Sequence, residues 1–301
     1  MPQILDILTC PLCGGTLEGI EKSLVCTGGT KKHNYDVAKE GYVNLLPPGK
    51  GKNAHTGDEA EMIRARSRFL QTGAYDGLSD EVSRLIARHI SADSVTLVDS
   101  GCGEGYHTRR IAVKLRDLHG RRVLCAAFDA SKHGAASGAK AAFRETLAPK
   151  AGAATPFSGD TSVYFFAGNI FSLPIRDTSC EVAVSMFAPI AWEENRRVLK
   201  DGGVLVVAAS GRDHLREMRE IIYDEVITKS PEILPADGFT LVDRTSVRYT
   251  HTLGSAEEIA DLFGMTPFCY KTPPEAAKRL LSMKSLAVTV HTEFFVFGKA
   301  L

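Results

Sequence analysis

The stretch Val98-Asp-Ser-Gly-Cys-Gly-Glu-Gly-Tyr106 decides the fold of this 301-residue chain. An apolar run, Val95–Val98, leads into it, and a helical pattern follows it. Glycines at positions 101, 103 and 105 allow a tight turn whose backbone can approach a ligand closely, and the helix offers free N–H groups at its N-terminus. The sequence therefore predicts a buried strand, a ligand-binding turn and a helix.

The glycine spacing separates two kinds of nucleotide-binding turn. A dinucleotide fingerprint needs its third glycine three residues after the second, and that position is Tyr106. The pattern Asp-x-Gly-x-Gly-x-Gly instead resembles the first motif of class I methyltransferases that bind S-adenosylmethionine (SAM). The alternative is an ordinary strand–turn–helix with incidental glycines. We expect methyl transfer.

Beyond this turn, short apolar runs alternate with helical patterns. The expected strands are Thr96–Asp99, Val123–Asp129, Val163–Ala167, Val182–Phe187, Val204–Ala209, Phe239–Tyr249 and Phe294–Gly298. The expected helices are Gly105–Leu118, Gly134–Leu147, Trp192–Lys200 (stopped by Asp201-Gly-Gly203) and His214–Thr228. This alternation predicts an α/β, Rossmann-like fold with a mainly parallel sheet and an antiparallel C-terminal strand. The stretch Ala148–Ser162 is expected to be a surface insertion.

Polar residues follow several of these strands at their carboxyl ends, where ligands bind in doubly wound sheets. Asp129 closes the second strand, 24 residues after Gly105, and its carboxylate can accept both ribose hydroxyls of the cofactor. Asn169 follows the third strand and can hydrogen-bond the edge of adenine. The segment Ser185–Pro189 ends the fourth strand, where its rigid proline either shapes a pocket for a flat base or only ends the strand.

A second cluster of chemistry-bearing residues lies near the N-terminus. Cys10 and Cys13 form a Cys-x2-Cys pair before two glycines, and Cys26 and His33 follow. Three thiolates and an imidazole can complete a tetrahedral zinc site, which stabilises a segment too short for its own core. Residues 16–18 and 23–25 are expected to form a hairpin there. A redox dithiol would need a βαβ context, which this region lacks.

The fourth zinc ligand is open to one alternative. The spacer between Cys26 and His33 is six residues, longer than the usual three to five. His55 is a weaker substitute for His33.

A basic linker and a helix separate the zinc segment from the glycine turn. Residues 49–52 are expected to form a flexible basic loop, and residues 59–72 a helix with acidic residues in its first turn. Arg64 and Arg68 share one face of this helix, whereas Arg66 points elsewhere. The helix is either simply solvated or part of a phosphate-contacting surface, and the neighbouring motifs favour the second interpretation.

Composition excludes several classes of protein. The chain has 44% hydrophobic and 24% charged residues and no net charge, as in ordinary soluble proteins, and contact with a polyanion must come from local patches. Seven cysteines favour thiols or metal ligands over disulfides. No apolar run reaches the roughly 18 residues of a membrane span, and the N-terminus does not read as a signal peptide. We expect a cytoplasmic protein with no membrane partner.

Three pieces of the sequence together resemble one family. They are the Cys10…His33 knuckle, the stretch Asp36–Leu46 with Gly57-Asp58…Met62…Ala65-Arg66…Phe69-Leu70, and the turn Asp99–Gly105. This combination looks like the RlmA (RrmA) family of 23S rRNA guanine-N1 methyltransferases, which includes the tylosin-resistance enzymes. Further matches lie at Gly211–Leu215, Ile222–Val226 and Met265–Phe268, so that the resemblance spans nearly the whole chain.

The resemblance implies a SAM cofactor, one structural zinc ion, a 23S rRNA hairpin as partner, and a homodimer. The implied zinc ligands are Cys10, Cys13, Cys26 and His33. The SAM contacts it implies are Tyr75, Gly103, Glu104 and His214. With the motif residues, the expected cofactor site is Tyr75, Asp99, Gly101, Gly103, Glu104, Gly105, Asp129, Asn169 and His214. The implied division is a zinc-binding RNA-recognition domain (1–46), a linker and helical segment (47–94) and a SAM-dependent methyltransferase domain (95–301).

Two other functions fit part of the sequence. A SAM-dependent methyltransferase acting on a small molecule or on another RNA explains the glycine turn but gives the zinc knuckle and the arginine helix no role. A catalytically inactive, zinc-dependent RNA-binding protein explains the knuckle but not the intact turn. Methylation at guanine N1 also needs a group that takes its proton, and Glu40, Asp58 and Glu104 are the candidates.

Overall fold

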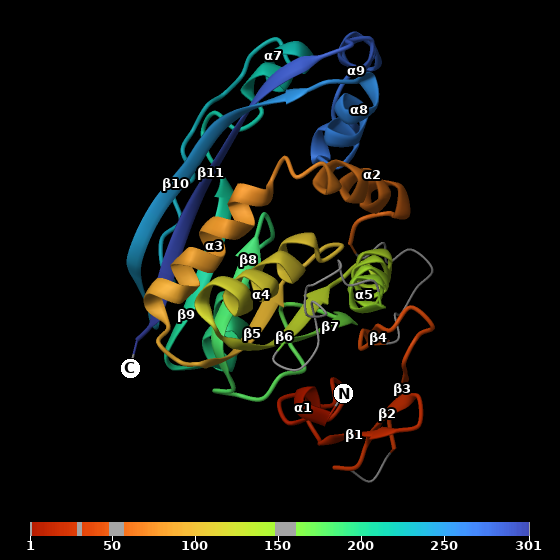
Figure 1. The fold of residues 1–301 in the computed structure, drawn as a ribbon, viewed down its shortest axis with the longest axis vertical. Helices are drawn as coiled ribbons and strands as arrows, with labels where there is room; N and C mark the ends of the chain where they lie inside the picture. The colour runs from red at the N-terminus through yellow and green to blue at the C-terminus, as the bar shows by residue number, and fades with distance from the viewer. Residues whose placement is uncertain (1, 29–31, 48–56, 148–160, 301) are drawn as a thin grey trace.

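The computed structural model describes residues 2–28, 32–47, 57–147 and 161–300 (Figure 1). The expected basic loop at residues 49–52, the alternative ligand His55 and residues 148–160 of the expected insertion lie outside these ranges. Within the described ranges, no helix has both the length and the apolar composition needed to cross a membrane.

An eight-stranded mixed sheet forms the centre of the molecule, in the order β10-β11-β9-β8-β5-β6-β7-β4. The parallel strands are β5 (Ser94–Ser100), β6 (Arg122–Asp129), β7 (Thr161–Ala167), β8 (Cys180–Met186), β9 (Leu199–Ser210) and the short edge strand β4 (Val43–Asn44). Strand β11 (Leu286–Lys299) runs antiparallel between β9 and β10 (Phe239–Leu253). This order confirms the mainly parallel sheet with an antiparallel C-terminal strand.

Alternate residues of the strands supply a separate hydrophobic cluster on each face of the sheet. On one face, Leu97 and Cys125 belong to the cluster that includes residues of α3 (Asp76–His89) and α4 (Tyr106–His119). Helix α5 (Lys132–Leu147) covers the β6–β7 part of the sheet through a third, smaller cluster. The opposite face buries Ala126 and Phe128 against α6 (Trp192–Val198) and the N-terminal segment.

The N-terminal segment is built onto this second face. It contains α1 (Pro2–Leu5) and a three-stranded sheet of β1 (Leu17–Ile20), β2 (Ser23–Cys26) and β3 (Asn34–Asp36), which confirms the expected hairpin. Ile4, Leu8 and Leu45 are fully or almost fully buried in one cluster with Phe128 and Phe166 of the main sheet. Strand β4 then joins the edge of that sheet beside β7. The zinc segment and the sheet therefore share one hydrophobic core.

Two segments far apart in sequence lie together above the carboxyl ends of the strands (Figure 1). One is α2 (Ala60–Gln71), close to the expected helix, and the other is an insertion between β10 and β11. The insertion contains α8 (Ala256–Gly264), the 3-10 helix η1 (Pro267–Tyr270) and α9 (Pro274–Leu281). Arg68 of α2 pairs with Asp261 of α8 at 2.6 Å. This insertion is not among the elements expected from the sequence.

Two expected helices end earlier than predicted. Helix α6 ends at Val198, and Leu199 already pairs with Cys180, because the segment Asp201-Gly-Gly203 continues β9 with a shift in register instead of ending the helix. Helix α7 covers only Arg216–Ile222. It begins after Leu215, whose φ of 52° is left-handed, and Arg279 of α9 donates a hydrogen bond to the carbonyl of Ile221 near its end.

We expect Gly105→Ala to lower the free energy of unfolding by about 2–5 kcal/mol, from left-handed backbone strain and overpacking together. Gly105 has φ 72°, and a Cβ there would lie 2.2 Å from the ring of buried Phe165. Gly120→Ala is the matched control, because Gly120 has φ 62° and open space around its Cβ position. Urea denaturation measures both changes, and equal losses in the two variants would show that packing against Phe165 does not matter.

Candidate functional site

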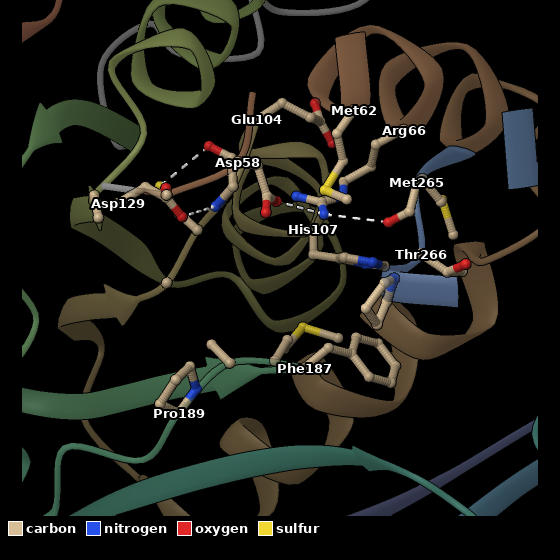
Figure 2. Close-up of a pocket in the computed structure, with 18 of the residues that line it drawn as sticks. Asp58, Met62, Arg66, Glu104, His107, Asp129, Phe187, Pro189, Met265 and Thr266 are labelled. Carbon is tan, nitrogen blue, oxygen red and sulfur yellow. Dashed lines mark hydrogen bonds and ion pairs between the residues drawn. The ribbon is translucent and has the colours of Figure 1, made fainter. Parts of the chain in front are cut away.

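A cavity of about 740 Å³ opens at the carboxyl ends of β5, β6, β7 and β8 (Figure 2). Its size is that of a small-molecule or cofactor site. Eight of the nine expected cofactor residues line it, namely Tyr75, Asp99, Gly101, Gly103, Glu104, Asp129, Asn169 and His214. Gly105 is not among the lining residues, since it packs against Phe165 behind the turn. The fold thus gathers residues that are up to about 140 positions apart in the chain.

Asp129 ties the glycine turn to the end of β6. The backbone N–H of Gly103 donates to Asp129 Oδ2 at 2.8 Å, and that of Ser131 donates to Asp129 Oδ1 at 2.7 Å. Burial raises the pKa of this carboxyl group, while these two hydrogen bonds oppose the rise. Each carboxylate oxygen has a second lone pair, so that Asp129 can still accept two hydroxyl groups.

Asp99 is a buried carboxyl group with an unused oxygen. Thr108 Oγ1 donates to Asp99 Oδ2 at 2.5 Å, whereas Asp99 Oδ1 has no hydrogen-bond partner within the described chain. Burial raises the pKa of Asp99 to about 7. Because a buried unpaired acceptor is costly, this oxygen is suited to a ligand that brings a donor or a positive charge.

Glu104 adds another acidic side chain to the turn. It is 4% exposed, and burial raises its pKa, while the charges of Arg109 and Arg66 oppose the rise. Together with Asp99 and Asp129 it gives the cavity an acidic wall. That wall suits the ammonium group, the sulfonium and the ribose hydroxyls of SAM.

Tyr75 and His214 form a hydrogen-bonded pair at the cavity wall. The backbone N–H of His291 donates to His214 Nδ1 at 3.2 Å, and His214 Nε2 lies 3.3 Å from the hydroxyl of Tyr75. Burial lowers the pKa of His214 to about 4, so that the imidazole is neutral at pH 7. With Nδ1 accepting, the proton sits on Nε2 and is donated to Tyr75. The hydroxyl hydrogen of Tyr75 is then free to bond a ligand.

Arg66 is a lining residue that the sequence analysis had not assigned to the cofactor site. Its Nη2 lies 2.6 Å from Asp58 Oδ2 and 3.4 Å from the carbonyl oxygen of Met265 (Figure 2). Its Nη1 is 3.1 Å from where a Cβ on Gly103 would lie. The guanidinium therefore sits directly against the glycine turn. Two signals in the sequence concern this position: Arg66 faces away from Arg64 and Arg68 on the helix, and the pair Ala65-Arg66 belongs to the family match.

The opposite wall of the cavity is apolar and aromatic (Figure 2). Phe187 and Pro189, from the end of β8, face Met62, Arg66 and Met265 across the space. The Phe187 ring is 42% exposed and stacks on His214 with centroids 6.1 Å apart. Its backbone φ of 54° is left-handed, which is strained for a phenylalanine and is typical of functional sites.

The remaining lining residues were expected from the sequence to different degrees. Asn169 is exposed at the cavity edge, where its Oδ1 accepts the backbone N–H of Phe171 at 3.0 Å. Met265 to Phe268, which form the roof, were noted in sequence only as a family match. His107, also unanticipated, lines the cavity and is held by Ser79 Oγ at 2.7 Å, and burial lowers its pKa to about 3.

The second site is the cysteine cluster of the N-terminal segment. The ligand atoms of Cys10, Cys13, Cys26 and His33 all lie within 4.8 Å of one another. Cys10 Sγ is 3.3 Å from His33 Nδ1, and Cys13 Sγ is 3.4 Å from Cys26 Sγ. Tetrahedral zinc with three sulfurs and one nitrogen separates its ligand atoms by about 3.5–3.8 Å. The long spacer thus still brings His33 to the three thiols.

The thiol chemistry of this cluster also fits a zinc ion, which binds thiolates rather than thiols. Burial disfavours the ionised form of Cys10, but hydrogen bonds from the Tyr35 hydroxyl and from the backbone at Leu12 and Cys13 outweigh it and lower the pKa of Cys10 to about 6. Tyr35 Oη lies 3.1 Å from Cys10 Sγ and supports that ligand from outside the cluster.

The sheet and its acidic cavity define a class I SAM-dependent methyltransferase, and the cluster defines a zinc ribbon placed before it. A family model described as RlmA, N-terminal, a zinc ribbon, matches residues 8–54. By its similarity over nearly the whole length, the chain belongs to the family of 23S rRNA (guanine-N1)-methyltransferases.

Two relatives illustrate the extent of the match. YxjB of Bacillus subtilis (strain 168), which carries the name of a 23S rRNA (guanine-N1)-methyltransferase, is 30% identical over 97% of this chain and 96% of its own. The 23S rRNA (guanine(748)-N(1))-methyltransferase of Streptomyces fradiae is 29% identical over 98% of this chain and 97% of its own. Among solved structures, the Bacillus YcgJ protein is 12% identical with a TM-score of 0.45, over 74% of this chain and 100% of that one.

We expect the purified protein to contain about one zinc ion per chain and Cys26→Ser to lose it, because a serine hydroxyl does not replace a thiolate ligand. The variant should also melt at a lower temperature, since metal binding stabilises the folded state. Cys269→Ser is the control: this thiol donates to the backbone carbonyls of Thr266 at 3.1 Å and Gly264 at 3.8 Å, and a hydroxyl can donate to the same groups. Metal analysis after gel filtration measures the stoichiometry. Zinc retained by Cys26→Ser would remove Cys26 from the ligand set.

Proposed function

We propose that this protein transfers a methyl group from SAM to N1 of a guanine in a hairpin of 23S rRNA. The observation that carries the proposal is the combination, in one chain, of an acidic SAM-type cavity and a four-ligand zinc cluster. The relatives whose names give this activity match over nearly the full chain, so that both parts are included in the comparison.

The cavity residues divide by what they can offer the cofactor, which supplies a methyl group made electrophilic by its sulfonium. We assign the ribose hydroxyls to Asp129, the adenine edge to Asn169 and the ammonium group to the unpaired oxygen of Asp99. Tyr75, oriented by His214, offers its hydroxyl hydrogen. The full proposed set is Tyr75, Asp99, Gly101, Gly103, Glu104, Gly105, Asp129, Asn169 and His214, in which Gly105 acts only by shaping the turn.

The chain contributes mainly alignment, because methyl transfer is an in-line displacement that depends on the placement of donor and acceptor. Guanine N1 is hidden in a Watson–Crick pair, so we propose that an unpaired or extruded base enters between Phe187 and the roof. The N1 proton needs an acceptor. Of the three candidates, Asp58 and Glu104 line the cavity and Glu40 does not. We therefore retain Asp58 and Glu104.

The remaining parts of the proposal concern the RNA and the assembly. We propose that residues 1–46 recognise the hairpin, that residues 47–94 connect them to the active site, and that residues 95–301 carry out the transfer. We also propose that the protein acts as a homodimer in the cytoplasm. Support for a role of the zinc segment in the reaction is its shared core with the sheet, since this fixes the segment relative to the cavity.

Two other functions make different predictions for the same assays. A methyltransferase for small molecules or another RNA binds SAM but leaves 23S rRNA unmodified. An inactive RNA-binding protein binds the hairpin without measurable affinity for SAM. Calorimetry with SAM and an RNA methylation assay together separate all three.

The protein should place one methyl group on a 23S rRNA hairpin transcript, and a reverse-transcriptase stop should map it, because N1 methylation blocks base pairing. Asp129→Ala should weaken SAM binding by about 1.5–3 kcal/mol for each lost charge-assisted hydrogen bond. Glu40→Ala, a carboxylate outside the cavity, is the control and should methylate normally. Absence of the stop with the unaltered protein and intact 23S rRNA would contradict the proposed substrate.

We expect Arg66 to bind the carboxylate in the methionine part of the cofactor. This contact would replace its ion pair with Asp58. Arg66→Gln should then bind S-adenosylhomocysteine at least tenfold more weakly, a charge-assisted bond being worth about 1.5–3 kcal/mol, yet keep its affinity for methylthioadenosine, which lacks the carboxylate. Asp58→Asn should bind the first ligand more tightly, because Arg66 no longer has a competing partner. Arg64→Gln, on the exposed side of the same helix, is the control. Equal losses for both ligands would make Arg66 purely structural.

A further inference from the structure

The exposed face of α5 carries positive charge with no acidic residue among it. Lys132, His133, Lys140 and Arg144 are all exposed there. At 3.6 residues per turn these four positions fall on one side of the helix, with the small residues Ala136 and Ser137 between them. The helix contains a single acidic residue, Glu145, which pairs with Arg109 of α4 at 3.0 Å. No ion pair joins the four to a carboxylate in the described part of the chain.

The placement of these charges works against the stability of the helix. Lys132 occupies the first turn, which has no acidic residue, although the positive end of the helix dipole disfavours a cation there. Positive charge in this turn is therefore not explained by the folding of α5. An anionic partner outside the chain would explain it.

Helix α5 also lies between α2, which lines the cavity, and β4, which follows the zinc cluster in the chain (Figure 1). Its first turn adjoins the cavity: Asp129 and Ala130 line the cavity, and Ser131 Oγ donates to the carbonyl of Asp58 at 2.6 Å. Further along, Ala139 and Ala142 belong to a hydrophobic cluster against which Tyr42 packs, and Tyr42 lies in the segment that joins the zinc cluster to β4. The exposed face thus runs from the cavity rim to the zinc segment.

The same face carries one exposed aromatic ring. Phe143 is 62% exposed, next to Arg144 and one turn from Lys140. Cationic residues interleaved with an exposed aromatic ring are typical of surfaces that bind unpaired nucleotides, in which cations contact phosphates and the ring stacks on a base. An apolar partner would not explain the surrounding lysines, and an anionic metabolite would not explain the length of the stripe, which is about 18 Å at 1.5 Å per residue.

We propose that this face, the α5 track, binds the phosphate backbone of the RNA between the part held by the zinc segment and the guanine in the cavity, with Phe143 stacking on an unpaired base. The proposal rests on the proposed function, since it assumes RNA as the substrate. It also relocates the cationic surface that the sequence analysis placed on α2. There, Arg66 lies in the cavity, while Arg64 and Arg68 pair with carboxylates.

The test is the salt dependence of binding to an in vitro transcript of the 23S rRNA hairpin that carries position 748, the position in the name of the Streptomyces relative. Lys132→Gln/Lys140→Gln/Arg144→Gln should bind about a hundredfold more weakly at 0.15 M salt, and the slope of log Kd against log salt should fall by about 2–3, as expected for three lost phosphate contacts. The control, Lys229→Gln/Lys278→Gln/Lys284→Gln, removes the same charge from exposed positions near α7 and α9 and should leave the slope unchanged.

A second pair of variants tests the stacking step without changing charge. Phe143→Ala should weaken binding of the same transcript about tenfold with the slope unaltered, whereas Leu118→Ala, equally exposed on α4, should have no effect. All variants should bind S-adenosylhomocysteine as the unaltered protein does, which shows that they are folded.

The outcomes separate the two levels of the proposal. Equal slopes for the α5 triple variant and the unaltered protein, or equal reductions in the α5 and control variants, would overturn the α5 track while leaving rRNA methylation in place. An unaltered protein that binds S-adenosylhomocysteine but neither binds nor methylates the transcript or intact 23S rRNA would instead overturn the proposed function.

Discussion

The hydrogen bond from the N–H of Gly103 to the carboxylate of Asp129 is the contact on which the site depends. It joins the turn after β5 to the end of β6, and it requires a backbone that comes close to a buried acid. Asp99, Glu104 and Asp129 are all buried around the glycine turn, and burial raises the pKa of each. These carboxyl groups therefore lower the stability of the protein when no ligand is bound. A cationic ligand with several donors relieves that cost, which explains why such an unfavourable cluster is built at the edge of a sheet.

The roof of the cavity makes the site depend on segments outside the sheet. Arg66 and Arg68 on α2 contact Met265 and Asp261 respectively, nearly 200 residues later in the chain. Helix α2 is at the same time the continuation of the zinc segment. Movement of α2 would therefore change the cofactor side and the α8 side of the cavity together. The cavity is therefore enclosed by the sheet, by α2 and by the insertion between β10 and β11.

Features encoded by local spacing were predictable from sequence, and features made by distant contacts were not. The zinc ligands, the β1–β2 hairpin and the mainly parallel sheet follow from short motifs and from alternation along the chain. The entry of Arg66 into the cavity depends on α8, and the glycine motif carries no information about α8. The sequence of α2 alone does not show which of its faces packs against a partner. The local preference of Asp201-Gly-Gly203 is to stop a helix, but Leu199 at the start of β9 already pairs with Cys180 of β8, so that these residues continue the strand. The roles of the individual cofactor residues remain predictions.

The pairing of β4 with β7 has a consequence for how the chain reaches its fold during synthesis. Val43 pairs with Phe166, about 120 residues later, whereas the four zinc ligands lie within about 24 residues of one another. Closing a short loop costs less entropy than closing a long one, and distant strand pairs form slowly. The metal cluster can therefore assemble on the emerging chain long before β7 exists. Until then Ile4, Leu8 and Leu45 have no sheet to cover them, so the nascent N-terminal segment must carry an exposed apolar surface while about the next 120 residues are made.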